Sequence, residues 1–201
     1  MVDLAAGDGG AAAERLAVAL VDGGARVVQL RMKGADAAAQ LLVARALAPW
    51  CRGRGVTFIV NDRLDVALAA AADGVHLGQD DLPLDAARAI APAGFVIGVS
   101  THDEAQARGA IAGGADYIGF GPCFVTTTKT NPDPVVGIER LEEVCSFATI
   151  PVVAIGGVGL DTVAAVVRAG ASAAAIIRAV NGATDIAAAA RAVTIAFAPS
   201  P

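Results

Sequence analysis

The chain has 201 residues, 55% of them hydrophobic and 17% charged, and this composition favours one globular domain over residues 1–201. Its formal net charge of −5 gives no field that would attract nucleic acid or an anionic membrane surface, so neither is expected as a partner. No stretch offers the roughly 20 uninterrupted apolar residues of a membrane span, and the start MVDLAAGDGG lacks the regions of a signal peptide.

Helices and strands are predicted to alternate along the chain. The first helix is predicted over residues 11–22, because apolar residues recur on one helical face and two glycines follow. Short and nearly continuous apolar runs predict strands at 26–30, 57–60, 74–77, 95–99, 117–120, 152–155 and 173–177. Helices are predicted between them and after them, at 36–54, 64–71, 84–91, 103–113, 138–147, 161–169 and from about 184.

This alternation predicts an α/β fold of the (β/α)8 TIM-barrel class. Apolar strands separated by helices are typical of a parallel sheet that is covered on both faces. A doubly wound sheet would carry its glycine fingerprint after the first strand, whereas Gly23 and Gly24 precede a strand. Only residues 1–4 could supply an N-terminal strand, so we expect the first strand to be short or missing.

Two neighbouring strands are each followed by carboxylates. The run at 57–60 ends in Asn61 and Asp62, and the run at 74–77 is followed by Gly78, Gln79, Asp80 and Asp81. The carboxyl ends of neighbouring parallel strands lie side by side, so Asp62 and Asp81 are predicted to face one pocket and share one divalent cation, Mg²⁺. A more ordinary role for Asp62 is to cap the following helix.

Other strand ends carry groups that suit a phosphorylated ligand. Cations and hydroxyls follow three strands, at Arg31, Lys33, Ser100, Thr126, Thr128 and Lys129. Together with a metal they indicate a pyrophosphate. Gly156 and Gly157 follow the strand at 152–155, where barrels commonly bind phosphate through backbone amides. Taken alone, Arg31 is more often a solvated surface charge.

His76 and the cysteines could invite a chemical role that the sequence does not favour. His76 is interpreted as a packed or hydrogen-bonded barrel histidine, since only His102 could join it as a metal ligand. Cys123 has no histidine close in sequence, and we interpret it as a small loop filler rather than a nucleophile. The cysteines are widely spaced and form no CxxC pair, which predicts a reducing cytoplasm and neither a disulfide framework nor a zinc site.

Six short motifs together resemble the thiamine phosphate synthase family. They read QLRMK from Gln29, NDR from Asn61, ADGVHLGQDD from Ala72, GVSTH from Gly98, TTTK from Thr126 and AIGG from Ala154. They occur in order between about residues 23 and 180. The resemblance implies a (β/α)8 transferase that joins hydroxymethylpyrimidine diphosphate to a thiazole phosphate, releasing diphosphate and forming thiamine phosphate.

The resemblance also implies a role for each matching residue. Asp62 and Asp81 would bind Mg²⁺. The diphosphate would be held by Arg31, Lys33, Ser100 and Lys129, of which Arg31, Ser100 and Lys129 would be catalytic. The pyrimidine would be oriented by Gln29 and Asn61. The thiazole phosphate would meet Thr126 and Thr128, and the backbone at Gly157, Ile177 and Arg178. Family members often have serine at the last of these positions.

Two alternative functions stay open from the sequence. A thiazole tautomerase-like relative would handle the thiazole phosphate without diphosphate or metal, and the pair Asp62 and Asp81 argues against it. A non-catalytic thiamine-precursor binding protein is the second, and it depends on the short N-terminus. Small phosphorylated molecules are the expected partners, and a homo-oligomer is compatible with the sequence.

Overall fold

The computed structural model of the chain describes residues 1–3, 9–126 and 133–198. The strands are β1 (Val2–Asp3), β2 (Val27–Arg31), β3 (Thr57–Asn61), β4 (Gly74–Leu77), β5 (Val96–Thr101), β6 (Tyr117–Phe120), β7 (Val152–Ala154) and β8 (Ala173–Ala174). The helices are α1 (Gly10–Asp22), α2 (Ala37–Arg52), α3 (Leu64–Ala69), α4 (Leu84–Ile90), α5 (Glu104–Ala112), α6 (Gly137–Phe147), α7 (Val163–Arg168), α8 (Arg178–Asn181) and α9 (Ile186–Ala196).

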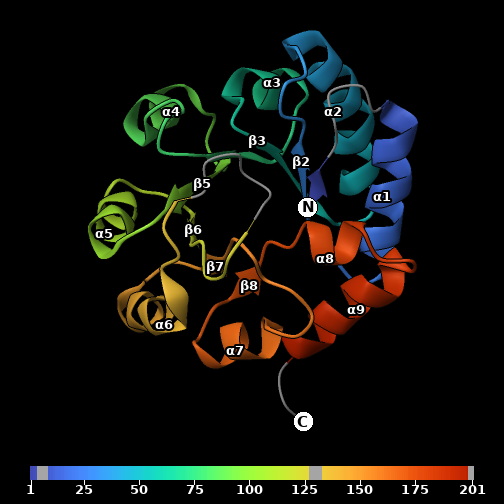
Figure 1. Ribbon diagram of the computed structural model, residues 1–201. Coiled ribbons are helices and arrows are strands. Elements are labelled where there is room, and N and C mark those ends of the chain that lie inside the picture. Colours follow the sequence, from blue (N-terminus) through green and yellow to red (C-terminus); the bar gives the residue numbers. More distant parts are fainter. Residues whose placement is uncertain (4–8, 127–132, 199–201) are drawn as a thin grey trace.

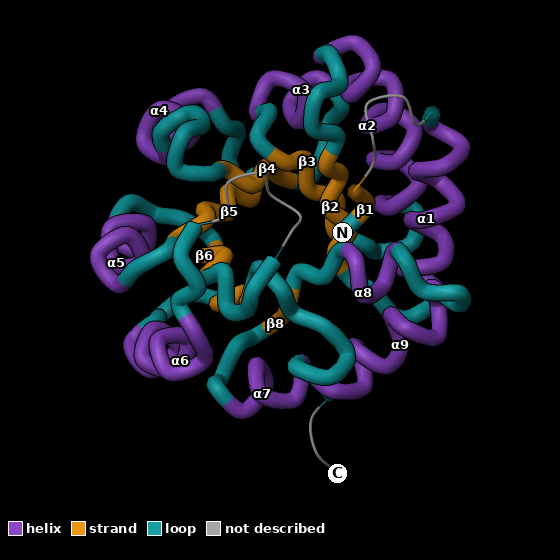
Figure 2. Tube along the Cα trace, in the orientation of Figure 1, coloured by secondary structure: helices purple, strands orange, loops and turns teal. Residues whose placement is uncertain are grey.

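The strands form one parallel sheet whose order follows the chain from β1 to β8. Figure 1 and Figure 2 show the sheet curled into an inner wall with the helices around its outside, as in a TIM barrel. The predicted α/β, TIM-barrel-like fold is therefore confirmed.

The two end strands of the sheet are shorter than those of a regular (β/α)8 barrel. Each has two residues, and among the described residues no strand pairing joins β8 to β1. Two hydrogen bonds between described residues bridge the seam instead. The Met1 nitrogen donates to Ile176 O at 3.3 Å, and Asn181 Nδ2 donates to Met1 O at 3.1 Å. The prediction of a short first strand is confirmed, and the (β/α)8 barrel is TIM-barrel-like without a closed eight-stranded ladder in the described residues.

Side-chain caps fix where several helices begin. Asp36 accepts from Ala39 N at 2.7 Å at the start of α2, and Asp103 accepts from Gln106 N at 2.8 Å at the start of α5. Most predicted elements match within about three residues. The clearest error is at 173–177, where the apolar run predicted a longer strand. The chain leaves the sheet after Ala174 and starts the unpredicted helix α8, so tertiary context overrides β-propensity there.

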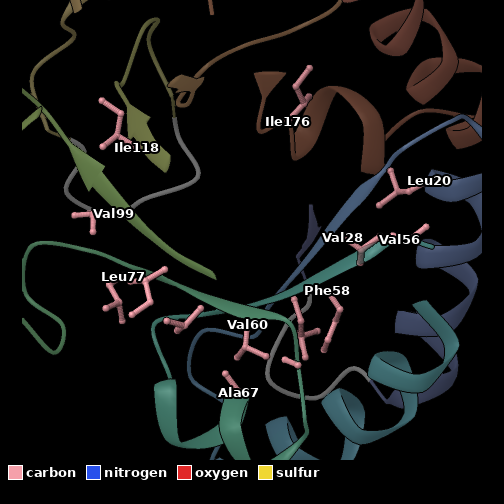
Figure 3. Close-up of a cluster of buried hydrophobic side chains, with 14 of the residues drawn as sticks. Leu20, Val28, Val56, Phe58, Val60, Ala67, Leu77, Val99, Ile118 and Ile176 are labelled. Carbon is pink, nitrogen blue, oxygen red and sulfur yellow. The ribbon is translucent and has the colours of Figure 1, made fainter. Parts of the chain in front are cut away.

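Alternate residues of each strand face opposite sides of the sheet, and this separates the core from the site. On β2, Val28 and Leu30 are buried in the main hydrophobic cluster, whereas Gln29 and Arg31 line a cavity inside the curl. The same alternation recurs on the next strands. Figure 3 shows cluster members on strands and helices, among them Leu20, Val28, Phe58, Val60, Ala67, Leu77, Val99 and Ile118.

In the described part of the chain, no helix has both the length and the apolar character that crossing a membrane requires.

Candidate active site

A cavity of about 260 Å³ opens inside the curl of the sheet. Its wall is built from inward-facing strand residues and from the loops that follow the strands. Among the residues that line it are Gln29, Arg31, Asn61, His76, Ser100, His102, Tyr117, Thr126, Asp133, Gly156, Gly157, Ile177 and Arg178. The structure thus brings together most of the residues that the sequence proposed for substrate binding.

Two side-chain amides meet on the wall of this cavity. Gln29 Nε2 donates to Asn61 Oδ1 at 2.8 Å, and the contact fixes both amide planes. In this arrangement Gln29 Oε1 is an acceptor and Asn61 Nδ2 a donor, one on each side of the pair. An edge that offers one donor and one acceptor fits the complementary edge of an aminopyrimidine ring.

Arg31 is held by a carboxylate that the sequence analysis did not identify. Its Nη1 lies 2.5 Å from Asp3 Oδ1, and only 12% of the Arg31 side chain is exposed. The alternative interpretation of Arg31 as a solvated surface charge is therefore wrong. Because a buried guanidinium with a fixed partner keeps its direction, Asp3 positions Arg31 toward the cavity.

His76, on β4, connects to the two following strands at the wall of the cavity. Its Nε2 lies 2.8 Å from Ser100 Oγ and its Nδ1 lies 2.9 Å from Tyr117 Oη, and the His76 and Tyr117 rings are stacked with centroids 5.4 Å apart. Burial raises the pKa of the Tyr117 phenol above its ordinary value, so the phenol stays protonated. The interpretation of His76 as a hydrogen-bonded barrel histidine is confirmed.

The Tyr117 ring lies directly over Gly98, its partner in the β5–β6 register. A Cβ at position 98 would lie 2.0 Å from Tyr117 Cζ, so we expect Gly98→Ala to lower the free energy of unfolding by about 3 kcal/mol, which urea denaturation measures. Near-UV circular dichroism of the single tyrosine should change as well.

A matched control for this substitution lies on α5. A Cβ at Gly109 has no atom within 4 Å, and alanine is a better helix former than glycine, so Gly109→Ala should raise the free energy of unfolding by about 0.5–1 kcal/mol. Equal stabilities of the two variants would contradict the close packing of Tyr117 on Gly98.

Asp62 and Asp81 approach each other at the ends of β3 and β4. The pKa of Asp62 is raised to about 6, first by burial and then by the charge of Asp81, while Lys33 and Arg31 oppose the shift. Lys33 Nζ lies 3.9 Å from Asp62 Oδ2, and Asp81 Oδ2 accepts from Gly78 N at 2.6 Å. A partly buried carboxylate whose proton affinity is raised by a second carboxylate beside it suits a divalent cation held between the two.

The backbone explains how Asp62 reaches this position. Its φ is 65°, in the left-handed region that non-glycine residues seldom occupy, and its N–H donates to His76 O at 2.7 Å. The following helix, α3, has Arg63 at its N-cap and no side-chain capping bond. The helix-capping role considered for Asp62 is therefore wrong.

Some proposed residues lie outside the cavity wall. Lys33, Asp62 and Asp81 are not among its lining residues, and Asp81 borders a second hollow beside α4 and α5. Thr128 and Lys129 lie outside the described residues, so their proposed contacts stay predictions. The described residues contain no group of three or more histidine, cysteine, aspartate or glutamate side chains that could hold a metal, so a cation here would depend on the aspartate pair.

The far side of the cavity is formed by loops after β6, β7 and β8. Thr126, Gly157, Ile177 and Arg178 all line it. Gly157 has a φ of 71°, and a Cβ there would lie 2.6 Å from Phe124 O, so only glycine fits this turn.

Cys123 and His102 are two further residues whose side chains could take part in chemistry. The Cys123 side chain is 1% exposed, and burial raises the pKa of its thiol to about 11, which agrees with a packing role. His102, Tyr117, Asp3 and Asp133 are cavity or cavity-supporting residues to which the sequence analysis gave no role. Strand parity could have identified Tyr117, because it occupies an inward position of β6.

Comparisons with known proteins identify the family of the chain. The sequence matches the family described as thiamine monophosphate synthase over residues 4–180. It is 49% identical over 189 residues to the thiamine-phosphate synthase of Anaeromyxobacter dehalogenans, covering 94% of this chain and 85% of that protein. It is 50% identical over 176 residues to that of Methanocella arvoryzae, covering 88% and 83%.

A solved structure gives the same result for the fold. The thiamine phosphate pyrophosphorylase from Pyrococcus furiosus superposes with a TM-score of 0.84 at 38% identity, over 92% of this chain and 88% of that one. The sequence motifs, the arrangement of the cavity and these similarities converge, and the chain belongs to the thiamine monophosphate synthase family.

Proposed function

We propose that this chain joins the methylene carbon of hydroxymethylpyrimidine diphosphate to the ring nitrogen of a thiazole phosphate, forming thiamine phosphate and releasing diphosphate. One observation carries the proposal: the aspartate pair lies beside a cavity that holds an amide pair and a fixed arginine. Relatives about half identical to this chain are named thiamine-phosphate synthase, which favours this transferase over a thiazole tautomerase or a binding protein.

We propose Mg²⁺ as the cofactor, held by Asp62 and Asp81. The fit rests on the donor set: two carboxylates within interaction distance, one of them with a raised pKa that a cation would lower. When bound, Mg²⁺ supplies positive charge that neutralises the leaving diphosphate. Lys33, close to Asp62, would add a second positive charge at the same end of the site.

The amide pair would orient the pyrimidine. Gln29 Oε1 would accept from the exocyclic amino group, and Asn61 Nδ2 would donate to a ring nitrogen, because their mutual bond leaves these atoms for a ligand. This orientation directs the methylene carbon toward the thiazole side of the cavity. Holding both reactants in one geometry is itself a large part of the rate enhancement.

The remaining groups act on charge rather than as nucleophiles. Arg31, Ser100 and Lys129 would hold the diphosphate, so that the bond between the methylene carbon and the diphosphate oxygen breaks early, with the electron pair leaving on that oxygen. The electron-rich aminopyrimidine spreads the resulting positive charge. The thiazole nitrogen then forms the new bond with its own lone pair, and no covalent intermediate with the protein is needed.

The thiazole phosphate would bind on the opposite wall. Thr126 and Thr128 would contact the thiazole, and the backbone at Gly157, Ile177 and Arg178 would contact its phosphate. The glycine turn after β7 brings main chain to the cavity where a side chain would not fit. At Arg178 the guanidinium adds a charge that the serine common in the family lacks.

We further propose that residues 1–201 work as one domain in the cytoplasm, as a monomer or a homo-oligomer. All three cysteines are free thiols, which agrees with a reducing compartment.

One assay tests the function. Purified protein is mixed with both phosphorylated precursors, with and without Mg²⁺, and thiamine phosphate is measured by fluorescence after oxidation to the thiochrome. We expect product only when both precursors and Mg²⁺ are present. Tight binding of both precursors without product under any condition would favour the binding-protein alternative.

A further inference from the structure

A row of paired residues crosses the strands β4, β5 and β6. His76 pairs with Gly98, and Gly98 pairs with Tyr117. The first and third strands of such a row lie about 9.5 Å apart, so their side chains meet only if the strand between them leaves room. Gly98 leaves that room because it has no side chain, and the His76 and Tyr117 rings stack with centroids 5.4 Å apart. The sheet itself therefore brings the two rings together.

A second glycine gives the His76 ring its place beside Ser100. Ser100 follows Gly98 by two residues, so its side chain lies on the same face of the sheet, and it pairs with Gly119 on β6. A Cβ at position 119 would lie 3.0 Å from His76 Cε1 and 3.4 Å from His76 Nε2. The edge of the imidazole thus fits against bare backbone, and its Nε2 reaches Ser100 Oγ.

Hydrogen bonds join the three side chains in a chain that ends at the cavity. Tyr117 Oη lies 2.9 Å from His76 Nδ1, and His76 Nε2 lies 2.8 Å from Ser100 Oγ. All three residues line the cavity, and His76 is only 7% exposed. Among the described residues, neither the phenol oxygen nor the serine hydroxyl has a second hydrogen-bond partner.

The phenol sets the direction of these hydrogen bonds. Burial keeps Tyr117 protonated by raising its pKa, and His76 Nδ1 is the acceptor within reach of its proton. When Nδ1 accepts, the ring proton is on Nε2, which then donates to Ser100 Oγ. In the opposite direction, the phenol proton would have no acceptor among the described residues. The first direction leaves the Ser100 proton for a ligand.

We propose that Tyr117 and His76 orient the Ser100 hydroxyl so that it donates into the cavity, to an oxygen of the leaving diphosphate. The inference rests on the proposed function, in which Ser100 holds the diphosphate. Tyr117 and His76 are positioning residues, because they act through Ser100 and do not touch the reacting atoms. A hydroxyl whose oxygen already accepts from a fixed imidazole has few directions left for its proton. It therefore needs no reorientation as negative charge develops on the leaving group.

The backbone of Ser100 is fixed independently of the two rings. Gln79 Nε2 donates to Ser100 O at 2.6 Å, and the register pairs Ser100 with Gly119. Loss of the phenol hydroxyl should therefore change the direction of the serine proton more than the position of the serine oxygen. Such a change should appear in kcat rather than in KM, because the contact strengthens as the diphosphate leaves.

Steady-state kinetics of the full-length protein test the proposal. Tyr117→Phe removes one oxygen and keeps the ring that stacks on His76. We expect kcat to fall about fivefold at saturating concentrations of both substrates, as for the loss of one hydrogen bond. The KM for the pyrimidine diphosphate should change less, because the contact between Gln29 and Asn61 is untouched. An unchanged kcat would overturn the proposal.

A double-mutant cycle tests whether Tyr117 acts through Ser100. Ser100→Ala should lower kcat about 30-fold, because it removes a donor to a charged leaving group. Tyr117→Phe/Ser100→Ala should lose no more than Ser100→Ala alone, because without the hydroxyl there is nothing left to orient. Losses that multiply in the double variant would overturn the proposal.

Thr101 provides the matched control. Its hydroxyl also joins β5 to β6, donating to Gly119 O at 3.3 Å, but Thr101 follows Ser100 and lies on the opposite face of the sheet. Thr101→Val should lower Tm and leave kcat unchanged. A loss of kcat equal to that of Tyr117→Phe would overturn the proposal, because any weakening between these strands would then slow the reaction.

Nitrogen-15 nuclear magnetic resonance of the His76 ring separates this inference from the proposed function. The chemical shifts of the ring nitrogens report which one carries the proton, whatever reaction the protein catalyses. The chain has two histidines, so His102→Gln assigns the signals. We expect the proton on Nε2 in the wild type and a mixture of tautomers in Tyr117→Phe. A wild-type proton on Nδ1 would overturn the inference even if thiamine phosphate is formed. Absence of thiamine phosphate with the wild type would instead overturn the proposed function.

Discussion

Replacing Asp62 by asparagine is expected to lower turnover by at least about 10³-fold, because the shared cation site would lose one of its two carboxylates. Metal charge on a leaving diphosphate is worth several kcal/mol, and each 1.36 kcal/mol is tenfold in rate. Asparagine is the appropriate substitution because position 62 has a φ of 65°, which asparagine tolerates and alanine does not. Asp81→Asn should give a loss of similar size.

The same substitution should stabilise the metal-free fold. The folded-state pKa of Asp62, about 6, lies above its ordinary value of 3.8, so the folded protein binds more protons between about pH 4 and 6. The free energy of unfolding therefore falls as pH rises through this window, and the loss is complete above it. A shift of this size corresponds to about 3 kcal/mol at most, and partial exposure of the side chain reduces it to about 1–2 kcal/mol.

Thermal unfolding and kinetics distinguish these effects. At pH 8 without metal, Asp62→Asn should have a higher Tm than the wild type, and Mg²⁺ should raise the Tm of the wild type alone. Asp65, three positions after Asp62, provides the control, because it is an exposed carboxylate paired with Arg63. Asp65→Asn should keep near-normal turnover. Normal turnover in Asp62→Asn as well would remove the metal assignment.

Much of the fold could be predicted because its elements have strong local signals. The strand at 57–60 is β-branched and aromatic, and the helix after it begins at Leu64 as expected. The ends of the sheet were harder. Ala173 and Ala174 are weak strand formers, and whether β8 meets β1 depends on contacts between the two ends of the chain, such as Asn181 to Met1.

The alternation of inward and outward residues along each strand identifies more of the site than the polar residues that follow the strands. Asn61, His76, Ser100 and Tyr117 occupy inward positions of four consecutive strands, and the register pairs Asn61 with His76. Residues that follow strands are visible in a sequence as polar interruptions. Inward residues within a strand do not stand out in this way, because an aromatic or histidine side chain there looks like part of an apolar core. Counting alternate positions along each strand is needed to find them.

Pairs of side chains that are far apart in the sequence could not be predicted. Asp3 and Arg31 meet because they are partners in the β1–β2 register, and His102 and Asp133 meet because they lie in the segments that follow the neighbouring strands β5 and β6. No periodicity or spacing in the sequence marks either pair.

Replacing Gly157 by alanine is expected to raise the KM for the thiazole phosphate at least about tenfold. A Cβ there would lie 2.6 Å from both Phe124 O and Val125 O, and these are backbone atoms that move only if the loop after β6 moves. The displaced loop is the one that leads to Thr126 on the cavity wall. The KM for the pyrimidine diphosphate should change less, because Gln29 and Asn61 lie on other strands.

Gly55 separates this steric effect from the cost of backbone conformation. Its φ of 64° is close to the 71° of Gly157, but a Cβ at position 55 would have no atom within 4 Å. Alanine in the left-handed region costs about 1–2 kcal/mol at either position, and only position 157 adds the clash. Urea denaturation should therefore give a loss of about 1 kcal/mol for Gly55→Ala and about 3 kcal/mol for Gly157→Ala. Only the second variant should change KM, and equal KM values in both would mean that the glycine turn does not shape the thiazole phosphate site.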